Sequence, residues 1–137
     1  LNNIMAYEFN RNQVDASKEV SVTMLTGGAN SPSIDLEQEI GGDIEAVAAE
    51  IEIPVEALLT DAKNLFFAIE DSADNSTFAA VDPAITTSVV GAGGVGNAAK
   101  SVRFRLSPAT RRYIRVAQTA DSTPGTLAND VTLRLLF

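Results

Sequence analysis

The feature of this sequence that most constrains its fold is a two-residue alternation of apolar and polar side chains in short segments. Val20, Val22 and Met24 alternate with polar neighbours, which is the pattern of a strand buried on one face. Similar segments recur at residues 34–36, 46–53, 64–70, 84–90, 101–106, 112–118 and 131–137, with clusters of Gly, Pro, Asn, Asp and Ser between them. About eight short strands with such turns predict an all-β fold, an antiparallel jelly-roll-like sandwich.

The chain length of 137 residues fits a single domain. Residues 1–17 are polar and aperiodic, and we interpret them as an N-terminal arm whose large anchors are Tyr7 and Phe9. Residues 18–137 then form the sandwich, with one helical turn compatible with residues 55–59. The alternation predicts these core residues: Leu65, Phe67, Ile69, Val102, Phe104, Leu106, Leu133 and Leu135.

Composition removes several classes of function. The chain has no Cys and no His, so thiolate and imidazole metal sites are absent, and a Ser or Thr nucleophile has no His base. A net charge of −8 disfavours binding to nucleic acid or to an anionic membrane. A glycosidase-type carboxylate pair stays open, because two such acids need not be close in sequence. We predict a protein that is not an enzyme and that has no cofactor and no metal.

The segment from Gly91 to Gly96 matches the G-x-G-x-x-G pattern of dinucleotide-binding loops and follows a β-branched run. That site also needs a helix of about three turns after the glycines and an acid about 20 residues on. Only residues 97–100 separate the glycines from the next strand, and no acid lies between Asp82 and Asp121. We therefore interpret the segment as a flexible glycine-rich loop between antiparallel strands.

The acidic segment from Asp71 to Ser76 is the best candidate for a calcium-binding loop. Asp and Asn side chains cap turns far more often than they bind metal, so a turn is the preferred interpretation. The acids at residues 35–39 alternate with apolar residues on a strand and lack the glycine turn of a calcium loop.

Charge is divided unevenly along the chain. Residues 35–82 carry thirteen acids and one base, whereas residues 100–115 carry six bases and no acid. The division fits either solvated strand faces or a bipolar surface that orients the chain against a copy of itself or a partner. Because arginine forms bidentate pairs with carboxylates, we predict a protein-interface role for Arg103, Arg105, Arg111, Arg112 and Arg115, together with Tyr7 and Phe9.

The order of elements in residues 60–137 is similar to that of a known family. The segment 64–74 ends in Ile-Glu-Asp-Ser-Ala-Asp, and Phe78, the glycine-rich connection, Phe-Arg-Leu-Ser-Pro at 104–108, Arg-Tyr-Ile-Arg-Val at 112–116 and a strand at 131–136 follow. This order resembles the Bbp16-like tailed-phage capsid cement (decoration) proteins. The resemblance implies a small jelly roll on the outer surface of the phage head. Its partners would be the major capsid protein and itself, as a homodimer or homotrimer.

The function expected from these observations is that of a structural virion protein that stabilises a phage head by bridging major capsid protein subunits. The alternative is a β-sandwich that binds carbohydrate or acts as a surface-adhesion module. The absence of Trp and the presence of only two Tyr count against this alternative, since sugar-binding platforms favour exposed aromatic rings.

Overall fold

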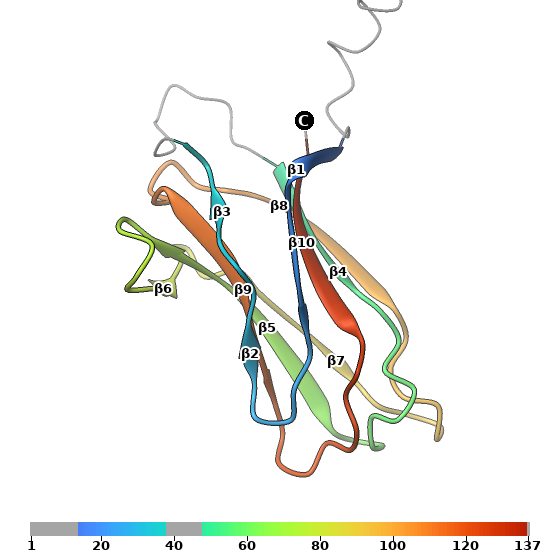
Figure 1. Cartoon of the computed structure of the whole chain (residues 1–137). Coiled ribbons are helices and arrows are strands. Elements are labelled where there is room, and N and C mark those ends of the chain that lie inside the picture. Colours follow the sequence, from blue (N-terminus) through green and yellow to red (C-terminus); the bar gives the residue numbers. More distant parts are fainter. Residues whose placement is uncertain (1–13, 38–47, 137) are drawn as a thin grey trace, which may run out of the picture.

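The computed structural model describes residues 14–37 and 48–136, which form two β-sheets packed face to face (Figure 1). Sheet A has the strand order β1-β10-β4-β8. Its members are β1 (Val14–Thr23), β10 (Asp130–Leu136), β4 (Ala48–Ile53) and β8 (Lys100–Arg105). All three pairings in this sheet are antiparallel.

Sheet B is built around the long pair β5 and β9, and each of its two edges is divided between two short strands. The order is β2-β9-β5-β6, with β3 also pairing with β9 and β7 also pairing with β5. The members are β2 (Ala29–Asn30), β3 (Ile34–Asp35), β5 (Asn64–Ser72), β6 (Ala79–Ala80), β7 (Thr86–Val90) and β9 (Tyr113–Ala120).

The predicted all-β sandwich is confirmed, and the described residues contain ten strands where about eight were expected. The two additional strands, β2 and β6, have two residues each, which is too short for alternation to reveal. β1 begins at Val14, inside the segment assigned to the arm. Residues 55–59 form no helical turn. Instead, Leu59 N–H donates to the Glu56 carbonyl in a single tight turn. Over the described ranges there is no helix, and hence no helix that could cross a membrane.

The core lies between the sheets, and most of the predicted core residues are fully buried in it. Leu65, Phe67 and Ile69 of β5 face Leu133 and its neighbours on β10. Val102 and Phe104 are only half-buried, which differs from the prediction. The cause is the position of β8 at the edge of sheet A, where one side of each side chain has no neighbouring strand to cover it.

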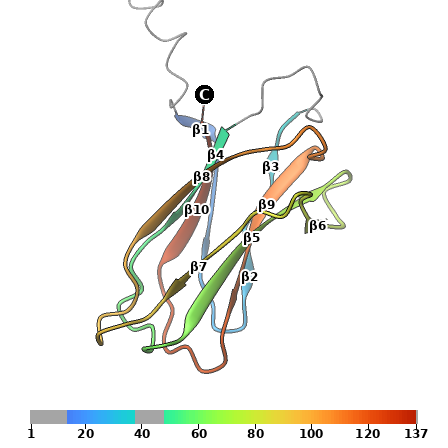
Figure 2. The ribbon, with the colours of Figure 1, turned by 180° about the vertical axis from the view of Figure 1, so that it is seen from behind.

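The loops are sorted between the two ends of the sandwich (Figures 1 and 2). The β1–β2, β4–β5, β7–β8 and β9–β10 connections meet at one end. The β5–β6 and β8–β9 connections lie at the other, where the start of β1 and the end of β10 are paired through Val14 and Leu136.

Candidate interaction surfaces

The glycine-rich loop serves the fold rather than a nucleotide site. It passes from β7 in sheet B to β8 in sheet A. The two strands that it joins are therefore not paired with each other, which differs from the predicted connection between antiparallel strands. No helix follows it. A Cβ added to Gly96 would lie 1.8 Å from the Glu56 carbonyl oxygen, and one added to Gly91 would lie 2.4 Å from that of Thr60. The loop backbone is therefore packed tightly against the β4–β5 connection.

The acidic segment at residues 71–76 is a hydrogen-bonded turn joined to a partly buried ion pair. Asp74 Oδ1 accepts hydrogen bonds from the backbone N–H groups of Ser76 and Thr77 and from the Ser72 hydroxyl. These donors lower the pKa of Asp74 to about 2, with the Thr77 N–H contributing most. Asp71 is buried, and its carboxylate accepts three hydrogen bonds from Arg111, two of them from the guanidinium. Both carboxylates thus have donors from the protein itself.

Two arginines of sheet A, Arg103 and Arg134, lie in cross-strand pairs with acids. Arg103 is opposite Glu50 in the β4–β8 register, and its Nε donates to Glu50 at 2.9 Å. Arg134 lies between β1 and β4 and pairs with Glu19, Glu50 and Glu52. We call Glu19, Arg134, Glu50, Glu52 and Arg103 the ion ladder of sheet A.

The arginines of the ion ladder lower the pKa of Glu50. Partial burial raises the pKa of the Glu50 carboxyl, but hydrogen bonds from Arg103 and Arg134 outweigh it, so the pKa lies below its ordinary value. Arg105 lies on the same face of β8 as Arg103, opposite Ala48.

The arginines of β9 and the segment before it are paired in the same way. Arg115 is opposite Glu70 in the β5–β9 register and binds it at 2.7 Å, with its guanidinium 4.0 Å from the centre of the Phe78 ring. Arg112 makes a bidentate pair with Asp35, at 2.8 and 3.0 Å. Arg112 first, and then the backbone N–H of Glu37, lower the pKa of Asp35 to about 2.

Strand pairing therefore brings the acidic and basic parts of the sequence together. β4 and β5 come from the acidic part, β8 and β9 from the basic part, and each acidic strand pairs with a basic one. Arg103, Arg111, Arg112 and Arg115, four of the five predicted interface arginines, each have a carboxylate partner within the chain. Tyr7 and Phe9, also predicted as interface residues, lie outside the described residues.

Four exposed large apolar side chains belong to loops that lie at the end opposite the paired strand ends. Leu25, Val55, Leu58 and Val95 are 52%, 42%, 67% and 69% exposed. They belong to the β1–β2, β4–β5 and β7–β8 connections, which meet at this end in both views (Figures 1 and 2). We call these four residues the apolar end. Alternation does not find them, because each lies outside a strand. The sequence signal that could have indicated these residues is the presence of an aliphatic residue within a turn-rich segment.

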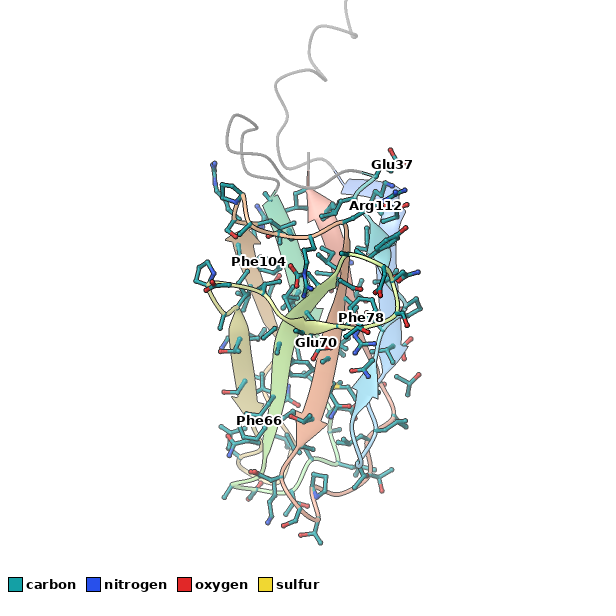
Figure 3. The ribbon with its side chains drawn as sticks, turned by 90° about the vertical axis from the view of Figure 1, so that its left-hand side faces the viewer. Glu37, Phe66, Glu70, Phe78, Phe104 and Arg112 are labelled. Atoms are coloured by element: carbon teal, nitrogen blue, oxygen red, sulfur yellow. The ribbon has the colours of Figure 1, made fainter. Side chains whose placement is uncertain are left out.

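A second surface lies on the outer face of sheet B. A shallow hollow of about 650 Å³ crosses β7, β5 and β9, and its lining includes Phe66, Ala68, Ser88 and Thr119. Figure 3 shows Phe66 toward the apolar end of this face, with Glu70 and Phe78 nearer its middle, where the segment bearing β6 crosses in front. Within the described ranges, no group of three or more acids is arranged to hold a metal ion.

Comparisons with known proteins do not assign the chain to a family. No family model and no curated protein matches the chain. Among solved structures, a Caldicellulosiruptor saccharolyticus module, CBM27-1, in complex with mannohexaose is 11% identical, with 85% of this chain and 71% of that chain covered and a TM-score of 0.49.

Two further solved structures are similar at the same level. The PBSX exported protein XepA is 12% identical, with 92% of this chain and 37% of that chain covered and a TM-score of 0.49. The infectious bursal disease virus VP2 subviral particle is 14% identical, with 90% of this chain and 29% of that chain covered and a TM-score of 0.40. The chain thus spans little more than a third of XepA and less than a third of VP2. Likenesses this distant carry no functional conclusion.

Proposed function

We propose that this chain is a structural virion protein, a capsid cement protein that binds the outer surface of a tailed-phage head and is not an enzyme. The observation that carries the proposal is the apolar end, where three loops at one end of the sandwich each carry at least one exposed aliphatic side chain. A concentration of exposed apolar surface is typical of protein–protein contact sites. The order of elements in residues 60–137, which resembles that of cement proteins, supports the head as the place of binding.

The proposed mechanism is additive. Each copy would bridge neighbouring major capsid protein subunits, and binding to the assembled shell but not to its separated parts stabilises the shell by mass action. Copies that also associate with one another, as homodimers or homotrimers, would gain from an increased effective concentration at the second contact.

The direct test uses empty heads assembled from the major capsid protein of a tailed phage. The purified chain should sediment with the heads and raise their melting temperature in proportion to occupancy. Unassembled capsid protein should bind far less. Failure to sediment with the heads, together with an unchanged melting temperature, would contradict the cement function.

Carbohydrate binding is the second candidate, and the hollow on sheet B is the observation that favours it. An exposed aromatic ring, Phe66, lies beside the hydroxyls of Thr86, Ser88 and Thr119, a combination suited to the apolar face and the hydroxyl groups of a sugar. Affinity electrophoresis in soluble polysaccharides should then show retardation that Phe66→Ala abolishes. Migration unaffected by any of the polysaccharides would count against this function.

A further inference from the structure

The apolar end is held in place by buried polar contacts, so its side chains project from a fixed backbone. Glu56, in the connection that carries Val55 and Leu58, is 2% exposed, and its carboxylate accepts hydrogen bonds from the backbone N–H groups of Ala128 and Asn129. The Asn97 side chain accepts from the Glu56 N–H at 2.9 Å. These bonds join the β4–β5 connection to the β7–β8 and β9–β10 connections. Docking at this end would therefore order few additional groups.

Each neighbouring loop adds a further contact. The Asn129 side chain donates to the Val55 carbonyl at 2.7 Å, and the Thr60 N–H donates to the Pro124 carbonyl at 2.8 Å. On the other side, the Leu25 N–H donates to the buried side chain of Gln118 at 2.9 Å. The loops that carry the four apolar residues are thus all tied to the body of the sandwich.

Carboxylates flank the apolar end on two sides. Asp61 follows Leu58 by three residues and accepts a hydrogen bond from the Gly94 N–H, next to Val95. Asp130 starts β10 beside Asn129 and accepts from the Thr23 hydroxyl. Neither Asp61 nor Asp130 forms a salt bridge with any lysine or arginine in the described part of the chain.

The two lysines nearest this end form no salt bridge with Asp61 or Asp130 among the described residues. Lys63 lies close enough to Asp121 to contribute to lowering its pKa, after the larger effect of hydrogen bonds from Asn64. Lys100 donates from Nζ to the Ser88 carbonyl at 3.2 Å. The negative charge of Asp61 and Asp130 therefore remains available to a partner.

We propose that the apolar end is the docking surface for the capsid shell, and that the matching shell surface has an apolar centre flanked by lysine or arginine. The inference rests on the proposed cement function and names the face and the partner chemistry. A second copy of this chain fits less well, because end-to-end contact would place like charges from Asp61 and Asp130 opposite each other.

The experiment measures binding of the full chain to assembled heads by sedimentation at low and high salt. Leu58→Ser with Val95→Ser should weaken binding about tenfold or more, because both side chains are largely exposed before docking. Val90→Ser is the matched control, since Val90 is 47% exposed but lies on the outer face of sheet B. It should bind as the wild type does.

The charge is tested with isosteric amides. Asp61→Asn and Asp130→Asn keep the acceptors for the Gly94 N–H and the Thr23 hydroxyl but remove both charges. The double variant should bind about threefold or more weakly at low salt and should lose most of the salt dependence. Circular dichroism and melting curves establish that each variant is folded.

Several outcomes would overturn the inference, and they are distinguishable from failure of the cement function. If the wild type does not bind heads, the cement function itself fails, and the shell as partner fails with it. If the wild type binds and the Leu58/Val95 variant binds equally well, the docking face lies elsewhere. Stronger binding by the amide variant excludes a basic partner. If the wild type forms end-to-end dimers that the Leu58/Val95 variant does not form, the occupant of the apolar end is a second copy of the chain. If deletion of residues 1–13 strengthens head binding, the occupant of the apolar end is the N-terminal arm.

Discussion

The arginine-rich strands β8 and β9 and the apolar end differ in how their residues are distributed along the sequence and in what the fold does with them. The arginines are concentrated in sixteen consecutive residues, 100–115, yet strand pairing distributes most of their charge among acids of β3, β4 and β5. The residues of the apolar end come from positions 25, 55, 58 and 95, and the loops bring them to one end. A local concentration in sequence therefore marks internal pairing here, and a scattered set forms the exposed surface.

The largest expected effect comes from the backbone of the apolar end. Gly96 has φ of +80° and its Cβ would overlap the Glu56 carbonyl, so Gly96→Ala should lower the free energy of unfolding by about 3 kcal/mol or more. Gly93 has φ of +67° with open space around it, and Gly93→Ala should cost only about 1 kcal/mol. Urea denaturation measures both. Equal effects would show that close packing does not hold this loop.

The next effect concerns the centre of the ion ladder. Arg134→Met keeps most of the volume but leaves Glu19, Glu50 and Glu52 without their shared cation. We expect a loss of about 1–2 kcal/mol, since one largely covered guanidinium serves three carboxylates. Unchanged stability at pH 7 would mean that the ladder contributes nothing net.

A smaller effect is expected at the edge of the same ladder, and it also tests which region docks. Arg103→Glu places a glutamate opposite Glu50 and should cost about 1 kcal/mol, whereas Arg103→Lys should be nearly neutral. Reversing Arg103 and Arg105 together should leave head binding unchanged if the apolar end docks. Weakened oligomerisation or head binding by the folded double variant, most marked at low salt, would assign the interface to these strands.

The smallest effect is a change in acid sensitivity at the Asp35–Arg112 pair. The folded pKa of Asp35 is about 2, below its ordinary value of 3.8, so its stabilisation is present above pH 4 and is lost as the pH falls toward 2. Asp35→Asn should flatten the fall in melting temperature over that interval. Asp74, lowered to about 2 by the N–H groups of its own turn, is an internal reference that should be unaffected. An Asp35 titration midpoint near 4, measured by NMR, would contradict the pairing.

The strands could be predicted from the sequence because their alternation is local. Leu65, Phe67 and Ile69 are buried as expected, since a central strand must bury one face. The edge position of β8 is set by the topology, and alternation therefore overestimated the burial of Phe104. The partners of Arg103 and Arg115 depend on register between strands about 45 to 53 residues apart, which no local pattern contains. Alternation does not predict the apolar end, because its four residues lie in loops.

The pairing of β1 with β10 has a consequence for protein engineering. Val14 and Leu136 lie side by side at the end opposite the apolar end, so the chain enters the first strand and leaves the last one at the same place. If the apolar end faces a shell, a peptide or enzyme fused after β10 would project outward from it. The same sandwich would then serve as a scaffold for displaying cargo on a particle surface, with the attachment point as far from the docking face as the fold allows.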